Sequence, residues 1–392
     1  MNKKNQLKIG IDARFFGPKQ KGLGRYVQKL VENLEKIMIN RGQSPAKRGL
    51  PPVSLEFVIF LRKDNWNEYQ PANPNFKKVL ANYKWYGFKE QIFFPFKIRK
   101  HKIDLMHFPH FNIPIFYFRP FIITIHDLIL KKFSTCRAST LTPFIYWLKS
   151  LAYQVVIFLA VKRSKKIIAV SNYTKNDILE YFKVKSSKIK VIYEGAPDSG
   201  TASQIEGSPP AILRRGLPPT YLLYVGNAYP HKNLERLILA FNKLIKDKKN
   251  LHLILVGEID YFYKRIQDKF SGSKQIIFTD FVSDKKLTYL YKNASLYIFP
   301  SLYEGFGLPP LEAMSYGTPV VCSQSSCLPE VLEDSVIYFN PEDINDMAEK
   351  IKYVLNNKDI QERLILMGFK QIRKYKWEKM ALEILKIYKS VD

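Results

Sequence analysis

The sequence predicts an α/β protein made of two doubly wound, Rossmann-like domains that face each other across a cleft. Two observations lead to this fold class. Short apolar runs alternate with amphipathic segments of helical length, and the alternation occurs twice along the 392 residues. Between the two series, residues 195–219 are rich in Gly, Ser, Pro, Ala and Thr, which is typical of a linker. We therefore expect an N-terminal domain over residues 1–200 and a C-terminal domain over residues 201–375.

The first series begins with a strand, a glycine-bearing loop and a helix, which is the usual opening of a nucleotide-binding unit. Short apolar runs predict strands at residues 7–12, 53–61, 104–108, 121–125, 166–171 and 188–193. Helical spacing predicts helices at residues 25–39, 88–99, 140–163 and 172–182. Ser171 precedes the last of these helices and is its expected N-cap.

The second series repeats the pattern. Strands are expected at residues 221–226, 251–257, 275–279, 296–299 and 319–322. Helices are expected at residues 233–246, 261–270, 284–293, 343–356 and 360–374. A final helix, residues 377–388, carries an apolar stripe, so we expect residues 376–392 to pack back toward the N-terminal domain.

Composition limits the class of protein. With 46% hydrophobic and 14% aromatic residues, the chain is neither disordered nor fibrous. The three cysteines, Cys136, Cys322 and Cys327, are odd in number and lack metal-ligand spacing, which indicates reduced thiols in a cytosolic protein. Residues 1–12 do not have the pattern of a secretory signal. We expect a cytoplasmic protein.

The charge is strongly positive and unevenly distributed. The formal net charge is +27, and residues 1–200 hold 36 Lys and Arg against 13 Asp and Glu, whereas the remainder holds 26 against 22. Such an excess in one half indicates an anionic partner, either a membrane surface or a nucleic acid, with solubility as the plainer alternative. The sequence contains neither zinc-finger spacing nor an aromatic–basic RNA motif, so we expect no nucleic-acid partner.

Residues 141–166 bear on the membrane alternative. The first part of this segment is apolar and aromatic, but Lys149 and Gln154 interrupt it, and Lys162, Arg163, Lys165 and Lys166 follow. A spanning helix needs about 20 uninterrupted apolar residues. We therefore favour a helix that is buried on one face, or that lies on an anionic membrane surface, over one that crosses the bilayer.

The segment from Pro300 to Met314 contains two carboxylates, Glu304 and Glu312, eight positions apart. A buried strand precedes it, glycines follow Glu304, and the pair Pro309 and Pro310 is typical of a helix start. Because the amides of a helix start attract anions, we interpret this segment as a ligand site in which the glutamates hold hydroxyls and the backbone faces phosphates. The alternative is an ordinary strand, turn and helix with two solvated glutamates.

Lys232 follows the first strand of the second series, at a turn where a helix begins. A lysine beside helix-start amides suits phosphate, although a solvated lysine is the alternative. His126 ends the strand at residues 121–125 and is expected to face the cleft, where it could contact a sugar hydroxyl or the reacting centre, or serve only the structure.

His107 and His110 are separated by Pro109 and lack a matching carboxylate pair, which favours a structural or substrate-lining role over a metal site. The sequence also lacks a spaced acidic pair beside the expected phosphate site. No metal is expected.

Together these segments resemble retaining glycosyltransferases of family 4, which have the GT-B fold. The resemblance spans nearly the whole chain and rests on Gly22-Leu-Gly-Arg-Tyr26, Ile125-His-Asp-Leu128, Tyr224-Val-Gly226, Pro230-His-Lys-Asn-Leu234 and Glu304-Gly-Phe-Gly-Leu-Pro-Pro-Leu-Glu312. It implies that Glu312 binds the nucleotide ribose and that Glu304 contacts the donor sugar. It also implies that Lys232 binds the diphosphate, that Gly24 approaches it, and that His126 lies near the transferred sugar.

The same resemblance implies that His126, Glu304 and Lys232 are the catalytic residues. It adds further donor contacts through the backbone amides of Phe306, Gly307 and Leu308, and through Gly226, Asn227, His231 and Val282. Members of the family commonly have an arginine where this chain has His231.

The implied reaction moves a hexose, with mannose from GDP-mannose as the first choice, to a lipid-linked or polysaccharide acceptor. It proceeds with retention and needs no metal or other cofactor beyond the nucleotide-sugar co-substrate. The enzyme is expected to attach peripherally to the inner face of the membrane. The alternatives are a non-catalytic sugar-nucleotide binder, a nucleic-acid-binding protein, and a glycoside hydrolase that uses Glu304 and Glu312 as its carboxylate pair.

Overall fold

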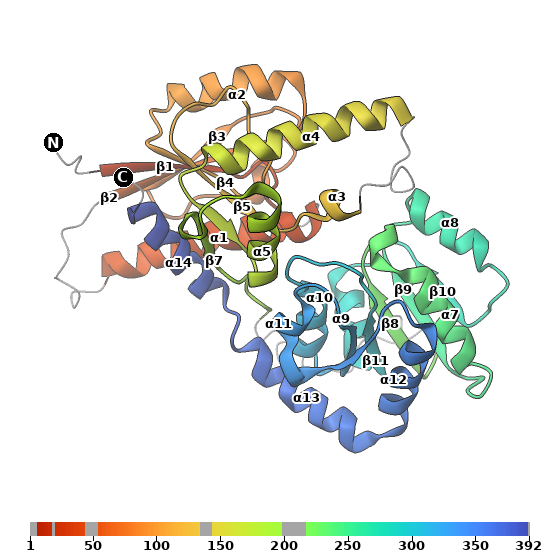
Figure 1. Cartoon of the computed structure of the whole chain (residues 1–392). Coiled ribbons are helices and arrows are strands. Elements are labelled where there is room, and N and C mark those ends of the chain that lie inside the picture. Colours follow the sequence, from red (N-terminus) through yellow and green to blue (C-terminus); the bar gives the residue numbers. More distant parts are fainter. Residues whose placement is uncertain (1–5, 18–19, 44–53, 134–142, 198–216, 391–392) are drawn as a thin grey trace. The chain divides into compact units, whose positions relative to one another are not determined.

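A computed structural model of the chain describes residues 6–17, 20–43, 54–133, 143–197 and 217–390 (Figure 1). The chain divides into two compact units. The N-terminal unit consists of Met1–Leu128, Phe144–Gly195 and Trp377–Asp392, and the C-terminal unit of Ile129–Pro143 and Ala196–Lys376. Each unit is built on one parallel sheet with helices packed against it, so the predicted α/β fold class is confirmed.

The sheet of the N-terminal unit has seven parallel strands in the order β3-β2-β1-β4-β5-β6-β7. Its strands are β1 (Gln6–Asp12), β2 (Ser54–Leu61), β3 (Phe76–Leu80), β4 (Leu105–Phe108), β5 (Phe121–Ile125), β6 (Ile167–Ala169) and β7 (Ile189–Val191). Every residue of β4, β5 and β6 is buried, as expected for central strands of a parallel sheet that is covered on both faces. The strand order reverses between β1 and β4, so the loops that follow these strands diverge there.

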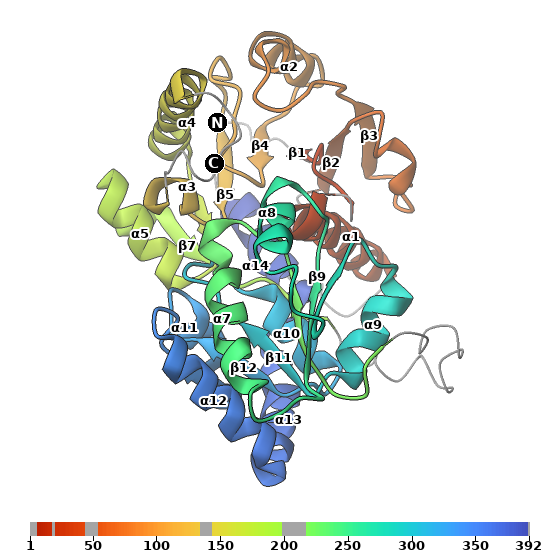
Figure 2. The ribbon, with the colours of Figure 1, turned by 90° about the vertical axis from the view of Figure 1, so that its right-hand side faces the viewer.

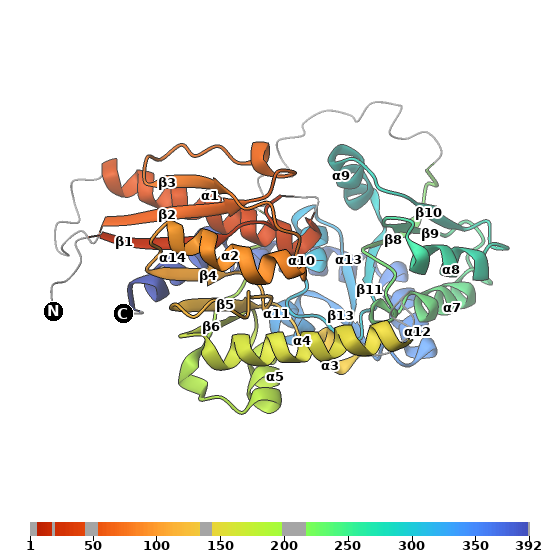
Figure 3. The same ribbon diagram turned by 90° about the horizontal axis from the view of Figure 1, so that it is seen from above.

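The helices of this unit cover the two faces of the sheet. They are α1 (Lys21–Gln43), α2 (Phe88–Lys100), α4 (Pro143–Arg163), α5 (Asn172–Phe182) and α14 (Trp377–Ser390). Side chains of α2, α4 and α5, such as Phe94, Ile157 and Phe182, join one buried cluster with the strands. Helices α1 and α14 contact each other, and Figures 1 and 3 show them on the face opposite α2 and α4.

The sheet of the C-terminal unit has six parallel strands in the order β10-β9-β8-β11-β12-β13. They are β8 (Tyr221–Val225), β9 (His252–Val256), β10 (Ile276–Thr279), β11 (Leu296–Phe299), β12 (Val320–Ser323) and β13 (Ile337–Phe339). The order reverses between β8 and β11. Sheets of this kind bind ligands beyond the carboxyl ends of the strands at such a reversal.

The helices of the C-terminal unit are α3 (Ile129–Lys132), α7 (Leu234–Leu244), α8 (Tyr261–Lys269), α9 (Asp284–Asn293), α10 (Leu308–Ser315), α11 (Leu328–Leu332), α12 (Ile344–Asn356) and α13 (Lys358–Ile372). Helices α7 and α12 pack side by side (Figure 2). Apolar residues recur with helical spacing in α7, and six of its side chains are buried.

Strongly periodic segments have the bounds that the sequence predicts. These are β5, β11, α5 and α9, and the hydroxyl of Ser171 caps α5 by accepting a hydrogen bond from the Thr174 amide. Strands β3 and β13 were not predicted. Strand β3 contains two lysines and β13 has three residues, so neither forms a long apolar run.

Helix α1 corrects one prediction, because it begins at Lys21 rather than at Arg25. Of the glycines that suggested a loop, Gly22 and Gly24 lie in its first turn, and Gly17 precedes it. A Cβ on Gly24 would lie 2.0 Å from the Gly17 carbonyl oxygen, so this glycine is needed for close packing rather than for a flexible loop.

Two further expectations concern the predicted linker and a possible membrane-spanning helix. Most of the predicted linker, residues 198–216, lies outside the described residues. Among the helices that the structure describes, none combines the length and the apolar character that a membrane span requires.

Candidate active site

The loop after β11 leads into α10, as the sequence predicts. Gly307 is the N-cap of this helix and has a φ of 90°, a left-handed conformation that favours glycine. A Cβ there would also lie 2.7 Å from Leu328. Because Pro309 and Pro310 have no N–H group, the amide donors nearest the helix start belong to Phe306, Gly307 and Leu308.

Lys232 and Glu304 form an ion pair within the C-terminal unit. Lys232 Nζ lies 2.6 Å from Glu304 Oε1, and the two side chains are only 14% and 11% exposed. The Glu304 amide donates a hydrogen bond to the Ser326 hydroxyl at 2.9 Å. The structure therefore brings together two of the three residues for which the resemblance implies catalysis, at the reversal point of the sheet.

Hydrogen bonds hold the turn that carries Lys232 against the loop after β11. Asn233 has a left-handed conformation, and its side-chain amide donates to the carbonyl oxygens of Pro300 and Pro341 at 3.1 and 2.8 Å. The Leu302 amide donates to the carbonyl oxygen of His231 at 2.8 Å. The contacts with Pro300 and Leu302 hold the Lys232 backbone against the loop that carries Glu304, and the contact with Pro341 ties it to the segment after β13.

His231 is buried beside this pair. Burial, together with the nearby charge of Lys232, lowers the pKa of His231 to about 4. The imidazole is therefore neutral at pH 7, and Lys232 is the cation of the turn. Replacement of the common arginine by histidine removes one positive charge from this position.

Glu312 lies on α10 and is half-buried. The hydroxyl of Tyr291, from α9, donates to Glu312 Oε2 at 3.3 Å. This contact orients the carboxylate. It could not be predicted from the sequence, because the two residues lie on separate helices.

Tyrosine hydroxyls support the backbone around Gly226 and Asn227. Tyr224 donates to the carbonyl oxygen of Asn227 at 2.7 Å, and Tyr263 donates to that of Gly226 at 3.1 Å. A Cβ on Gly226 would lie 2.5 Å from the Tyr224 hydroxyl. Glycine is therefore required for this loop geometry.

Two donor-site candidates remain, Phe306 and Val282, and their surroundings differ. Phe306 is 4% exposed, and its ring lies edge-on to Tyr375 with centroids 5.3 Å apart. Its side chain therefore packs in the interior, which leaves its backbone for the implied role. Val282 is half-buried in the segment between β10 and α9.

His126 belongs to the N-terminal unit, where it follows β5. Its Nδ1 lies 2.8 Å from Glu194 Oε1, and its Nε2 lies 3.1 Å from the carbonyl oxygen of Pro109. Burial favours the neutral ring, but the hydrogen bond and the charge of Glu194 outweigh it and raise the pKa of His126. Sequence reasoning missed Glu194, although its place just after β7, on the same sheet, could have indicated it.

His107 has a structural role. Its two ring nitrogens lie 2.6 Å from the Tyr388 hydroxyl and 2.9 Å from the Thr124 hydroxyl, and burial lowers the pKa of His107 to about 3. Tyr388 lies on α14, so this contact ties the last helix to the N-terminal unit. Within the described part of the chain, no group of three or more His, Cys, Asp or Glu side chains is arranged to hold a metal ion.

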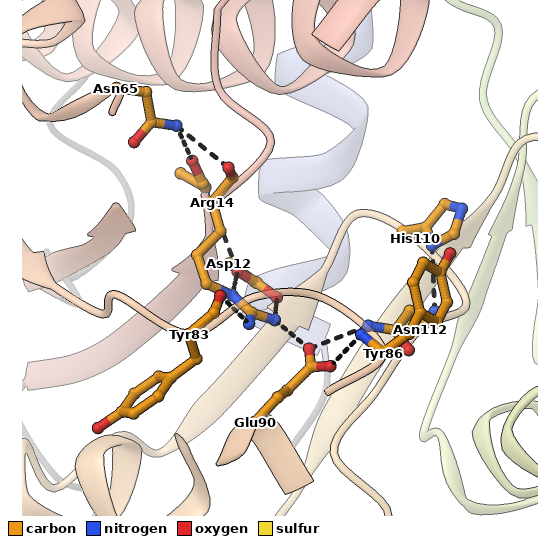
Figure 4. Close-up of polar contacts among 9 residues, drawn as sticks. Asp12, Arg14, Asn65, Tyr83, Tyr86, Glu90, His110 and Asn112 are labelled. Atoms are coloured by element: carbon orange, nitrogen blue, oxygen red, sulfur yellow. Dashed lines mark hydrogen bonds and ion pairs between the residues drawn. The ribbon is translucent and has the colours of Figure 1, made fainter. Parts of the chain in front are cut away.

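Sequence reasoning also missed a buried charge network in the N-terminal unit (Figure 4). Arg14 Nη2 lies 2.7 Å from Asp12 Oδ2 and 2.6 Å from Glu90 Oε1. The side-chain amide of Asn112 and the backbone amide of Tyr86 also donate to the Glu90 carboxylate, at 2.9 and 2.7 Å. The network joins the loops after β1 and β4 to the start of α2.

Comparison with known proteins identifies the family. The model described as "Glycosyl transferases group 1" matches residues 210–371, and the model described as "Glycosyltransferase Family 4" matches residues 55–199. The chain is 28% identical to O-antigen chain mannosyltransferase B of Escherichia coli over 74% of this chain and 76% of that protein. It is 30% identical to O-antigen chain mannosyltransferase RfbU of Salmonella typhimurium over 59% of this chain and 63% of that protein.

Solved structures support the fold. Sucrose-phosphate synthase from Thermosynechococcus elongatus has a TM-score of 0.74 at 19% identity and covers 98% of both chains. WaaG, a glycosyltransferase involved in lipopolysaccharide biosynthesis, has a TM-score of 0.68 at 14% identity over 97% of this chain and 99% of that chain. This chain therefore belongs to glycosyltransferase family 4, a family of retaining, nucleotide-sugar-dependent enzymes with the GT-B fold.

Proposed function

We propose that this enzyme transfers mannose from GDP-mannose to a lipid-linked or polysaccharide acceptor during the assembly of a surface polysaccharide. The choice of mannose is supported by the names of two relatives, which are O-antigen chain mannosyltransferases. The observation that carries the proposed chemistry is the largely buried Lys232–Glu304 pair beside the start of α10.

The pair explains how a diphosphate leaving group is stabilised. Cleavage of the sugar–phosphate bond increases the negative charge on the diphosphate, and a fixed ammonium with oriented amides stabilises that charge in a site of low polarity. Lys232 supplies the ammonium, and the amides of Phe306, Gly307 and Leu308 are the donors. We propose that these groups act without a metal.

Glu304 and Glu312 then act as acceptors of hydroxyl groups. When a diphosphate takes over Lys232, the Glu304 carboxylate is released to accept hydrogen bonds from the donor sugar. Glu312, oriented by Tyr291, accepts those of the nucleotide ribose. The acceptor hydroxyl attacks the anomeric carbon from the face from which the diphosphate leaves, and its proton passes to the departing diphosphate. The configuration at that carbon is thereby retained.

A panel of nucleotide sugars tests this function. GDP-mannose is expected to raise the melting temperature of the enzyme and to release GDP in the presence of acceptor. Glu312→Ala removes the ribose contact and should abolish the thermal shift, whereas Glu362→Ala, on the exposed side of α13, should not. A shift with a different donor only would reject the choice of mannose, and an unchanged shift in Glu312→Ala would reject the ribose assignment.

We also propose that the enzyme attaches to the cytoplasmic face of an anionic membrane through its N-terminal unit. Helices α2 and α4 lie on the same face of the seven-stranded sheet (Figure 3). Both helices expose large apolar side chains to solvent. We call these residues the α2–α4 surface; they are Phe88, Phe93, Phe96, Trp147, Leu148, Leu151, Val155 and Phe158. Exposure of so many aromatic and aliphatic groups on one face is unusual for a protein that contacts only water.

Cations accompany this surface. Lys89, Arg99 and Lys100 are exposed on α2, and Lys149 and Lys162 are exposed on α4. Apolar side chains that enter the headgroup region, together with lysines and arginines that attract anionic lipids, are the two elements of interfacial binding. The sequence predicted such a role for the segment that forms α4, and the structure adds α2 to the proposal.

Vesicle sedimentation tests the attachment. The enzyme should bind vesicles that contain phosphatidylglycerol, bind pure phosphatidylcholine weakly, and dissociate as salt is raised. Phe93→Ser combined with Trp147→Ser should reduce binding at least about tenfold, because two large apolar groups no longer enter the interface. Tyr353→Ser combined with Leu366→Ser, which removes exposed apolar groups from the C-terminal unit, is the matched control. Equal binding by both double variants would reject the α2–α4 surface.

A further inference from the structure

The two ring nitrogens of His126 face acceptors that cannot donate a hydrogen bond to them. Nδ1 lies 2.8 Å from a carboxylate oxygen of Glu194, and Nε2 lies 3.1 Å from the carbonyl oxygen of Pro109. A neutral imidazole has one donor and one acceptor nitrogen, and it could satisfy only one of these partners. Both contacts are satisfied when both nitrogens carry a proton.

The surroundings of His126 leave Glu194 as its direct ionic partner. From α1, the ring of Tyr26 lies edge-on at a centroid distance of 4.6 Å, and burial raises the pKa of Tyr26, so its hydroxyl stays neutral. From α5, the Thr174 hydroxyl donates to the carbonyl oxygen of His126. The adjacent Asp127 carries a further negative charge that favours a protonated ring.

The neighbouring histidines do not compete for the proton. Burial lowers the pKa of His107 and of His110 to about 3, and the positive charge of His126 adds to this effect. Both are therefore neutral at pH 7. The positive charge in this part of the N-terminal unit rests on His126, whose side chain is 17% exposed and so remains within reach of a ligand.

We infer that Glu194 is a positioning residue that holds His126 as an imidazolium, so that His126 acts in sugar transfer as a hydrogen-bond donor and a positive charge rather than as a base. The Nδ1–H group keeps donating its hydrogen bond to the Glu194 carboxylate. The Nε2–H group, which donates to the Pro109 carbonyl oxygen, can donate to a ligand oxygen instead. The inference rests on the proposed function only in placing a sugar near His126. The charge state of the ring is independent of that function.

Histidine NMR on the full-length enzyme tests the charge state directly. The chain has six histidines, and the resonance that disappears in His126→Asn identifies His126. In the wild type this resonance should titrate above the ordinary histidine value of about 6.5. Glu194→Gln keeps the size of the side chain and an acceptor oxygen but removes the charge, and it should lower the His126 pKa by at least about one unit.

The control is Glu180→Gln, which removes an exposed carboxylate from α5 in the same unit and should leave the His126 titration unchanged. Glu194→Asp, which restores the charge, should recover a raised pKa. It also provides a second variant if Glu194→Gln does not fold. A His126 resonance that titrates at the same pH in the wild type and in Glu194→Gln would overturn the inference.

The pH dependence of transfer tests the positioning role. In Glu194→Gln the alkaline decline of kcat should move to lower pH, whereas Glu180→Gln should keep the profile of the wild type. If the NMR titration moves and the profile of kcat does not, the role of Glu194 in transfer is overturned. Failure of the proposed function itself is recognised separately, because it would leave every nucleotide sugar without turnover while the NMR titration still moved.

Discussion

Lys232 Nζ lies 2.6 Å from Glu304 Oε1, and this ion pair joins two residues that are 72 positions apart in the chain. The cation that suits a diphosphate is thus bound by a carboxylate of the same unit. A diphosphate must therefore compete with Glu304 for Lys232. The first prediction tests this competition.

Glu304→Gln should bind GDP more tightly than the wild type, by roughly three- to tenfold, because the amide no longer neutralises Lys232. Transfer should fall at the same time, because the sugar loses an ionised acceptor. Titration calorimetry with GDP and an assay of GDP release measure the two effects. Weaker GDP binding in Glu304→Gln would contradict the competition.

Lys232→Ala should weaken GDP binding by roughly ten- to a hundredfold, the usual effect of losing a charge-assisted hydrogen bond. Lys264→Ala, which removes an exposed lysine from α8, is the matched control and should leave binding unchanged. The same calorimetric titration compares the two variants. Equal affinities for both would show that Lys232 does not contact the diphosphate.

Gly226→Ala should destabilise the enzyme by about 1–3 kcal/mol, because the new methyl group would lie 2.5 Å from the Tyr224 hydroxyl. Tyr224→Phe removes that hydroxyl, so the double variant should recover part of the loss. Chemical denaturation of the two single variants and the double variant completes a double-mutant cycle. Strict additivity of the two effects would exclude this steric explanation.

Glu90→Ala should cost about 3–5 kcal/mol of unfolding free energy, because it leaves the buried guanidinium of Arg14 with one carboxylate partner fewer. Burial raises the pKa of Glu90, although the charge of Arg14 opposes this shift. The expected loss of unfolding free energy therefore arises in the packed interior and not from an exposed ion pair. Glu180→Ala is expected to change stability by less than about 0.5 kcal/mol. Denaturant titration at pH 7 separates the two outcomes.

Acid should destabilise the enzyme partly through His107. Its folded pKa is about 3, below the unfolded value of about 6.5, so the neutral ring contributes full stability above pH 6.5 and loses it as the pH falls toward 3. The slope approaches about 1.4 kcal/mol per pH unit for one histidine. Denaturation between pH 7 and pH 5 should show a shallower loss in His107→Gln than in the wild type.

His126 should have the opposite dependence. Its folded pKa is raised, so its contribution to stability is full below the unfolded pKa and declines as the pH rises through the folded value. The difference in unfolding free energy between the wild type and Glu194→Gln should therefore be larger at pH 6 than at pH 9. Paired denaturation curves at these two values measure it.

The sequence alone determined the fold class and the segments that carry the site. Short apolar runs and helical spacing are local patterns, and they located strands such as β5 and β11 and helices such as α5 and α9 at their observed bounds. Local glycines and prolines likewise located the start of α10 beside Glu304 and Glu312. Strands β3 and β13 were missed because the first contains two lysines and the second has three residues, so neither forms a long apolar run.

Only the tertiary structure decided which charged groups meet. The pairs Lys232 with Glu304, His126 with Glu194, and Arg14 with Glu90 join residues that are 72, 68 and 76 positions apart. No local period relates such residues, because their contact depends on how the sheet orders its strands and on which loops then lie together. The charge of His126 and of His231 depends in turn on burial and on these partners, and so it is a property of the folded chain.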